Sequence, residues 1–211
     1  GDGPVRVTTA GGEVTARHLV LGCNGYLGGL APGIASRIMP INNYLVATAP
    51  LGDLGPRLIA DPACVHDTLF VVNYFRLAPD GRLVFGGGET YTRRFPADIA
   101  AFVRGPLLRV FPRLAGVPIQ YAWGGTLAIT MNRLPHFGRL GPAVWFAQGY
   151  SGHGIAMATL AGKLIAEAMA GTVERFDVFA RLPPPPFPGG TLLRWPGQVL
   201  GMLWFALRDR L

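Results

Sequence analysis

Residues 149–154 read Gly-Tyr-Ser-Gly-His-Gly and have the residue types and spacing of a ligand-binding turn. Three glycines in six residues let backbone N–H groups approach a ligand closely. The apolar residues 143–148 before the turn predict a buried strand, and the alanine-rich residues 155–170 after it predict a helix capped by Gly171. That helix would direct its partly positive N-terminal end at the turn. We therefore expect an anionic group to bind there.

Two other strand–turn–helix motifs do not match the order of residues in this turn. A hydrolase nucleophile elbow requires Gly-x-Ser-x-Gly, but the residue two positions after Ser151 is His153. A dinucleotide-binding fingerprint requires Gly-x-Gly-x-x-Gly, whereas the glycines here follow the order Gly-x-x-Gly-x-Gly. A tight turn that serves only close packing of helix and strand remains an open alternative at this point.

The glycine turn and the helix after it resemble the C-terminal flavin-contacting segment of the D-amino-acid oxidase and sarcosine oxidase superfamily, which are FAD-dependent amine oxidoreductases. Other stretches agree in order along the chain. Residues 18–25 resemble the last strand of the dinucleotide domain in that superfamily, and residues 73–88 resemble the central hairpin of its substrate domain. With residues 121–138 and 187–190, the closest likeness is to the γ-glutamylputrescine oxidase branch.

The resemblance implies an α+β fold that forms the C-terminal half of a two-domain flavoprotein. A mainly antiparallel substrate-domain sheet would accompany the last strands and the C-terminal helix of the FAD-binding domain. Members of the superfamily begin with a βαβ unit that carries Gly-x-Gly-x-x-Gly and a ribose-binding acid, and these 211 residues contain no such unit. We expect the chain to be cut from a longer one or to be one piece of a split protein, with a missing N-terminal half as partner.

Four parts are expected along the chain. They are the end of the FAD-binding domain at residues 1–30, the substrate domain at 31–135, a return to the FAD-binding domain at 136–180, and a tail at 181–211. Residues 5–21 predict a hairpin that feeds a buried strand. In the substrate domain, strands are predicted at residues 44–49, 69–77, 82–86 and 119–129, and a helix at 97–110.

The chemistry implied by the resemblance is oxidation of an amine by hydride transfer to flavin N5, which gives an imine and then an aldehyde. Reduced flavin carries negative charge near N1 and C2=O, which the helix N-terminus and the backbone donors of residues 151–155 would stabilise. His153 is the expected catalytic donor, although a histidine in such a turn can also serve only local hydrogen bonding. The expected cofactor-binding residues are Gly22, Asn24, Gly25, Gly149, Tyr150, Ser151, Gly152, His153, Gly154 and Ile155.

Two departures from the superfamily bear on the substrate. Relatives that oxidise D-amino acids carry an arginine at the position of Leu127, which binds the substrate carboxylate in a bidentate pair. Sarcosine-oxidising relatives carry a lysine at the position of Ala156, and the single lysine of this chain, Lys163, matches neither this nor their flavin-facing lysine. We therefore expect an alkyl amine without an α-carboxylate, similar to γ-glutamylputrescine.

Candidates to line the substrate pocket come from the strands of the substrate domain. Because strand side chains alternate between the two faces of a sheet, about half of them will point away from the pocket. Two other functions remain open: an amino-acid or sarcosine-type oxidase that holds its carboxylate from the missing half, and a catalytically silent fragment or interaction module. The candidate residues are Asn73, Tyr74, Arg76, Glu89, Tyr91, Trp123 and Thr126.

Composition narrows the partners and the compartment. The net charge of +7 comes almost entirely from arginines, but they are scattered and only Arg93 and Arg94 are adjacent, which argues against a nucleic-acid surface. The two cysteines form no metal motif or disulfide framework and no export signal is visible, so we expect a cytoplasmic protein. The tail is expected to pack on protein, with an interfacial membrane helix over residues 199–207 as the alternative.

Overall fold

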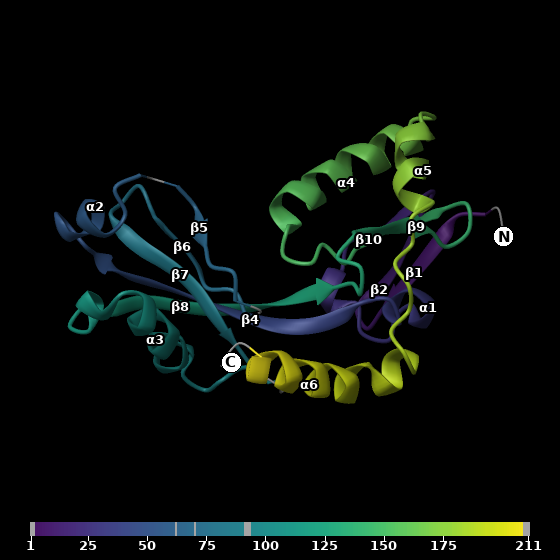
Figure 1. Cartoon of the computed structure of the whole chain (residues 1–211). Coiled ribbons are helices and arrows are strands. Elements are labelled where there is room, and N and C mark those ends of the chain that lie inside the picture. The colour runs from purple at the N-terminus through teal and green to yellow at the C-terminus, as the bar shows by residue number, and fades with distance from the viewer. Residues whose placement is uncertain (1–2, 62, 70, 91–93, 209–211) are drawn as a thin grey trace. The chain divides into compact units, whose positions relative to one another are not determined.

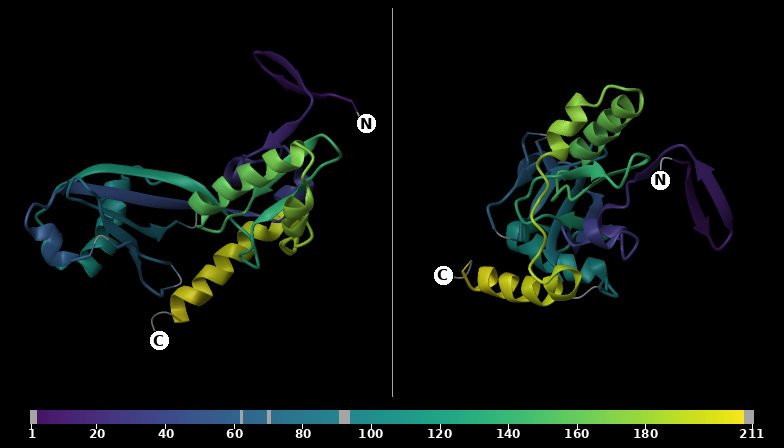
Figure 2. Two further views of the ribbon diagram at one scale, coloured as in Figure 1. Left: turned by 90° about the horizontal axis from the view of Figure 1, so that it is seen from above. Right: turned by 90° about the vertical axis from the view of Figure 1, so that its right-hand side faces the viewer.

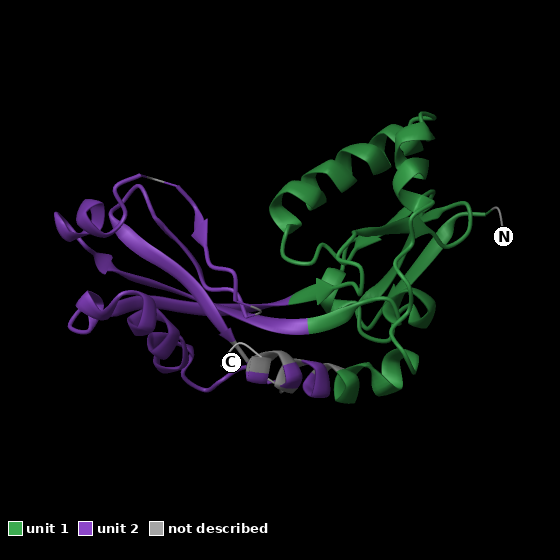
Figure 3. Cartoon of the chain, viewed as in Figure 1, with its two compact units in different colours: residues 1–40, 127–197 green, residues 41–126, 198–211 purple. Residues whose placement is uncertain are grey.

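The computed structural model describes residues 3–61, 63–69, 71–90 and 94–208 (Figure 1). The chain divides into two compact units (Figure 3). Unit 1 comprises residues 1–40 and 127–197, and unit 2 comprises residues 41–126 and 198–211. The boundaries between the units fall within two long strands and the last helix. The assignment of the units to an FAD-binding and a substrate domain stays a prediction.

Unit 1 contains a three-stranded sheet in the order β3–β10–β9. The middle strand pairs in parallel with β3 and antiparallel with β9. A parallel pair is typical of strands connected by a long crossover, and here residues 41–126 of unit 2 lie between β3 and β10 in the sequence. The strands are β3 (Leu19–Leu21), β9 (His136–Arg139) and β10 (Val144–Gln148).

Two helices, α4 (Gly154–Met169) and α5 (Glu174–Ala180), lie against this sheet (Figure 1). The buried residues of α4 recur at helical spacing, so one stripe of the helix faces the sheet. Gly171 has φ +106°, a value that favours glycine, and it follows the helix as predicted. The predictions of a buried strand, a helix and a glycine cap are therefore confirmed. The core that joins these elements contains Phe137, Trp145, Ala147, Ala161, Leu164, Ile165, Ala168 and Phe176.

The chain opens with an antiparallel hairpin of β1 (Val5–Thr9) and β2 (Gly12–Ala16). It projects away from the other elements of unit 1 in both views of Figure 2. The predicted hairpin before a strand is thus confirmed. After β3 come η1 (Asn24–Tyr26) and α1 (Pro32–Ala35). Leu27 directly after η1 and the apolar residues of α1 share a core with Phe146 of β10.

Unit 2 is built on a five-stranded sheet in the order β5–β6–β7–β4–β8. The pairs β5–β6, β6–β7 and β7–β4 are antiparallel, as expected for the substrate-domain sheet. Residues 119–129 form a strand with the predicted bounds. The strands are β4 (Met39–Pro50), β5 (Val65–His66), β6 (Tyr74–Leu77), β7 (Arg82–Glu89) and β8 (Ile119–Ile129).

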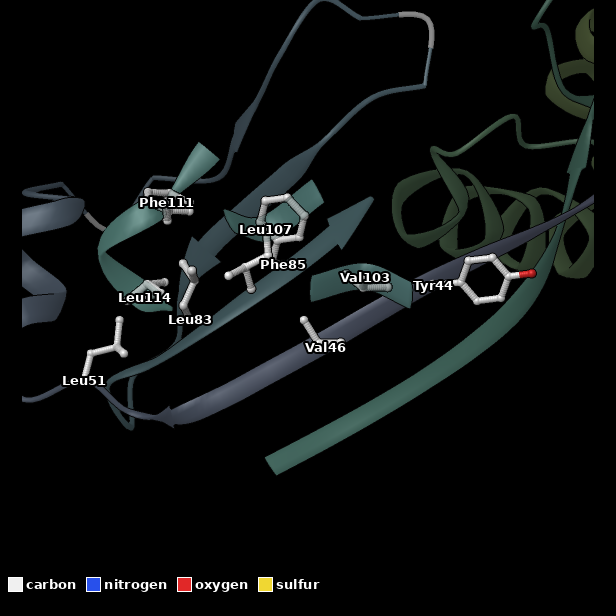
Figure 4. Close-up of a cluster of buried hydrophobic side chains, with 9 residues drawn as sticks. All are labelled: Tyr44, Val46, Leu51, Leu83, Phe85, Val103, Leu107, Phe111 and Leu114. Atoms are coloured by element: carbon white, nitrogen blue, oxygen red, sulfur yellow. The ribbon is translucent and has the colours of Figure 1, made fainter. Parts of the chain in front are cut away.

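One face of this sheet is covered by α3 (Ile99–Val110), the helix predicted at residues 97–110. The Asp98 side chain caps it by accepting the N–H of Ala101, and the 3-10 helix η2 (Pro112–Leu114) follows. α2 (Leu54–Leu58) lies in the connection after β4. The core beneath α3 is formed by Tyr44, Val46, Leu51, Leu83, Phe85, Val103, Leu107, Phe111 and Leu114 (Figure 4).

The strand predicted at residues 69–77 is too long, because among the described residues of this range only Tyr74–Leu77 is a strand. The cause is the carboxylate of Asp67, which accepts the N–H of Leu69 at 3.2 Å and the N–H of Asn73 at 3.0 Å. A short acidic side chain that accepts hydrogen bonds from nearby backbone N–H groups favours a loop over the hydrogen-bond ladder of a sheet. The sequence pattern did not reveal this competition.

The tail forms α6 (Gly190–Arg208), and both its start and the segment before it bond to the residues that follow α1 in unit 1. The N–H of Phe187 donates to Ser36 O at 2.9 Å, and the guanidinium of Arg194 donates to Ile38 O at 2.8 Å. Farther along α6, Leu200, Trp204 and other described apolar side chains are exposed, so the prediction that the tail packs on protein stays a prediction. No helix in the described part of the chain is long and apolar enough to cross a membrane.

Candidate functional site

The turn between β10 and α4 has a backbone conformation that few residue types adopt. Gly149, Ser151 and Gly152 have φ values of +71°, +51° and +97°. A Cβ atom on Gly149 would lie 2.5 Å from Cγ2 of Thr130 and 3.3 Å from Cγ2 of Ile38. Gly149 is therefore required both for its positive φ and for close packing.

Two of the N–H groups predicted to bind a ligand, those of Ser151 and His153, are used inside the protein. Ser151 N–H donates to Ala128 O at 3.0 Å, and His153 N–H donates to Tyr150 O at 2.9 Å. These two groups cannot also bind a ligand. The set of backbone donors predicted over residues 151–155 is therefore smaller than expected.

The remaining N–H groups lie at the start of α4. No described residue accepts a hydrogen bond from the N–H of Gly152, Gly154, Ile155 or Ala156. Gly152 is exposed, a Cβ there would meet open space, and Ile155 is 95% exposed. Free donors at the N-terminus of a 16-residue helix attract an anion or an oxygen that gains negative charge. Ala156 is a donor that the sequence analysis did not include.

His153 occupies the N-cap position of α4 and is exposed. Its imidazole makes no capping hydrogen bond, and no described residue hydrogen-bonds to it. The alternative role of local hydrogen bonding therefore has no counterpart in this structure. The ring is available to a ligand beside the free N–H groups.

The side chains of Tyr150 and Ser151 are turned into the protein. The Tyr150 hydroxyl donates to Ala147 O at 3.1 Å, and burial raises the pKa of this phenol. Ser151 is only 8% exposed, and its Oγ accepts the N–H of Thr130 at 3.2 Å and donates to Gly149 O at 3.3 Å. Both were predicted to bind the cofactor, but these side chains support the turn from within.

The residues after β3 meet the glycine turn, as the predicted cofactor site requires. Oδ1 of Asn24 accepts the N–H of Gly149 at 2.9 Å, and Asn24 itself has φ +46°. Gly22 is exposed beside it, whereas Gly25 is buried within η1. Two segments that are far apart in the sequence thus come together at one place in unit 1.

Two residues beneath the turn were missed by the sequence analysis. Nε2 of Gln148 lies 2.9 Å from Ile34 O and 3.2 Å from Nδ1 of His136, whose ring packs edge-on against Phe146. Burial, with a smaller effect of the Arg37 charge, lowers the pKa of His136 from 6.5 to about 4. His136 is therefore neutral near pH 7, with Nδ1 as an acceptor. No spacing in the sequence marks this pair.

Tyr74 and Arg76, two candidates for the substrate pocket, lie on the face of the unit 2 sheet that α3 leaves open. Between them in β6 is Phe75, which pairs with Phe85 of the core, so alternation directs its two neighbours to the opposite face. The Tyr74 hydroxyl donates to Oδ1 of Asn43. Burial raises the pKa of Tyr74, and the bond to Asn43 opposes part of this shift.

The structure places the other candidates for the substrate pocket in different positions. Thr126 lies on the α3 side, where its hydroxyl donates to Oδ1 of Asn42 at 3.0 Å. Trp123 must therefore lie on the face of Tyr74, and it is 43% exposed. The Asn73 amide is committed to the loop, because Nδ2 donates to Oδ2 of Asp67 at 2.6 Å. The Glu89 side chain and the whole of Tyr91 lie outside the described residues.

Comparison with known proteins identifies the family. Residues 1–168 match the family described as FAD dependent oxidoreductase. The chain is 45% identical over 210 residues to gamma-glutamylputrescine oxidoreductase of Escherichia coli (strain K12), an alignment of 99% of this chain and 49% of that protein. It is 43% identical over 208 residues to a probable oxidoreductase of Rhizobium meliloti (strain 1021), with 99% and 48% covered. The chain thus spans about half the length of these curated relatives.

Solved structures share the fold. Glycine oxidase from Geobacillus kaustophilus matches with a TM-score of 0.65 and 19% identity over 85% of this chain and 48% of that one. L-proline dehydrogenase from P. horikoshii matches with a TM-score of 0.62 and 22% identity over 82% of this chain and 48% of that one. The resemblance drawn from the sequence and its α+β fold are confirmed. The chain belongs to the family of FAD-dependent oxidoreductases.

Proposed function

We propose that this chain is the C-terminal half of an FAD-dependent amine oxidoreductase that acts on a γ-glutamylputrescine-like amine. The observation that carries the proposal is the set of free N–H groups at Gly152, Gly154 and Ile155, which lie at a helix N-terminus beside the exposed His153. In the family to which the chain belongs, the cofactor is FAD. The remaining contacts to FAD would come from the N-terminal half.

The residues present fit one edge of a flavin. FAD, when bound, accepts a hydride from the carbon beside the substrate nitrogen and becomes negatively charged at its pyrimidine edge. Backbone N–H groups that are already oriented stabilise charge where it develops, at no cost of reorganisation. Gly152 adds a close approach, since it presents no side chain and a Cβ there would meet open space. His153 would donate a further hydrogen bond at the same edge.

The open face of the unit 2 sheet supports the proposed substrate. Tyr74, held by Asn43, and the partly exposed Trp123 give this face an amphipathic aromatic lining. Arg76 is exposed on the same face and has no ion pair with any described residue. A guanidinium there would bind a carboxylate remote from the reacting nitrogen, such as that of a γ-glutamyl group. Neither Leu127 nor Ala156 offers a cation for an α-carboxylate beside the nitrogen.

The test is reduction of flavin by candidate substrates, measured by stopped-flow absorbance in protein expressed from the full reading frame. We expect γ-glutamylputrescine to reduce the flavin faster than putrescine, and both to act faster than sarcosine or D-amino acids. A preference for α-amino acids would favour an amino-acid oxidase instead. Protein that binds no FAD would favour the catalytically silent module.

A matched pair of variants tests the carboxylate contact. Arg76→Gln should raise KM for γ-glutamylputrescine by about 10-fold and leave the value for putrescine unchanged, because putrescine has no carboxylate. Arg57→Gln, at an exposed arginine of α2 in the same unit, should change neither value. Equal effects of Arg76→Gln on both amines would contradict this role.

A further inference from the structure

We propose that Asn24 is a positioning residue whose side-chain carbonyl holds the glycine turn in the conformation that presents its free N–H groups. The inference rests on the proposed function, because the turn matters only if a flavin lies against it. It also revises the role expected from the sequence, in which Asn24 binds the cofactor itself. Its Oδ1 is instead engaged by Gly149 N–H at 2.9 Å.

The backbone of Asn24 is held in an uncommon conformation. Its φ of +46° lies in the left-handed region, which asparagine tolerates better than most residues other than glycine. Glycine would adopt this conformation more easily but offers no side-chain acceptor. Asparagine is thus one of the few residues that satisfies both the local backbone and the N–H of Gly149.

The bond acts at the first residue of the turn. Gly149 directly follows β10, and its φ of +71° sets the direction in which the chain leaves the sheet. Farther along, Ser151 N–H donates to Ala128 O of β8, and Ser151 Oγ accepts the N–H of Thr130, the residue after β8. The turn is therefore fixed at its start by Asn24 and in its middle by Ser151. The N–H groups of Gly152, Gly154 and Ile155 are left without an acceptor among the described residues.

Two substitutions distinguish the effect of the side-chain acceptor from the effect of the backbone conformation. Asn24→Gly keeps the positive φ and removes the acceptor, whereas Asn24→Asp keeps both an acceptor and tolerance of positive φ. In protein from the full reading frame, Asn24→Gly should weaken FAD binding by roughly 5- to 10-fold, the loss expected for one hydrogen bond. Amide hydrogen exchange at Gly149 should become faster by a similar factor. Asn24→Asp should restore both quantities to within about 3-fold of wild type, as expected for a retained hydrogen bond.

Arg133→Gly is the matched control. Arg133 also has a positive φ, +62°, and is exposed in the turn between β8 and β9. Its N–H donates to Thr130 O at 3.2 Å, but its side chain bonds to no described residue, so it offers no acceptor to another segment. Replacing it by glycine adds the same backbone freedom and should leave FAD affinity and Gly149 exchange unchanged. Normal affinity and exchange in Asn24→Gly would overturn the positioning role, as would a failure of Asn24→Asp to restore them. Wild-type protein without FAD affinity would instead overturn the proposed function, while the exchange measurement still tests the bond to Gly149.

Discussion

Two glycine clusters in this chain look alike in the sequence and differ in what surrounds them. In β7, a Cβ on Gly86 would lie 2.1 Å from Cζ of Tyr74, and one on Gly87 would lie 2.6 Å from Oδ1 of Asn73. In the turn before α4, a Cβ on Gly152 would meet open space. The glycines of β7 make room for side chains of the protein itself, whereas Gly152 leaves room for something else. Glycine content alone does not identify a binding site.

The largest effect on stability is expected at a glycine that is covered by a side chain. Gly86→Ala should lower the free energy of unfolding by about 3 kcal/mol, because the new methyl group would displace the Tyr74 ring from its place beside Asn43. Denaturant unfolding of the chain measures this. Gly105→Ala in α3, where a Cβ meets nothing within 4 Å, should be neutral or stabilising. Equal stability of the two variants would refute the packing role of Gly86.

A second prediction concerns His153, which lies between Gly152 and Gly154 in the turn before α4. Removing one donor beside the developing charge in His153→Ala should slow flavin reduction by about 10²-fold, which corresponds to roughly 2.7 kcal/mol. Because the imidazole is exposed and hydrogen-bonds to no described residue, the unfolding free energy should not change. Stopped-flow reduction and thermal unfolding of the same preparation measure both quantities. An unchanged rate would remove His153 from the mechanism.

The pH dependence of stability tests the support beneath the turn. The pKa of His136 is lowered from 6.5 to about 4 in the fold, so the unfolded chain takes up a proton at higher pH than the folded chain does. Stability from this residue is present above pH 6.5 and decreases as the pH falls toward 4, by about 3 kcal/mol. His136→Gln should lose less stability than wild type between pH 7 and pH 4.5. Identical slopes would mean that the histidine is not kept neutral by burial.

A small effect on stability is expected at Gly152. Gly152→Ala should cost about 1 kcal/mol, since the only penalty is an alanine at φ +97° and no atom obstructs its Cβ. FAD binding should fall by more than this, because the methyl group would occupy the space proposed for the flavin. Titration with FAD in protein from the full reading frame would detect the difference. A variant that binds FAD normally would show that the open space is not the cofactor site.

Some parts of the fold follow directly from local pattern. The strand before the turn, the helix α4 and the cap at Gly171 were predictable because periodicity, alanine content and glycine placement all agree there. The loop at Asp67 was not predictable, since one carboxylate decides between ladder and loop. The short helices α1, α2 and α5 were missed for a different reason. Their few residues carry too little periodicity.

The candidate site was only partly predictable. The sequence brought Asn24 and the glycine turn together through the resemblance, and the structure places them in contact. It could not tell that Ser151 faces inward, because a serine at positive φ has no signature of its own. Alternation predicted that substrate candidates would divide between two faces, but the assignment of Thr126 and Trp123 needed the partner Asn42. His136 could be identified only from the structure, which shows that it is buried.

The short strand β3 has a consequence for handling the purified chain. It is an edge strand of its sheet and, within the described part of the chain, pairs only with β10. The N–H and C=O groups along its other edge therefore bond to no neighbouring strand in the described residues. Val20 on this strand is 46% exposed. An uncovered edge with an apolar side chain is a template on which a second strand can add. We expect chains prepared on their own to associate through this edge as their concentration rises, so light scattering across a dilution series should precede every measurement of affinity.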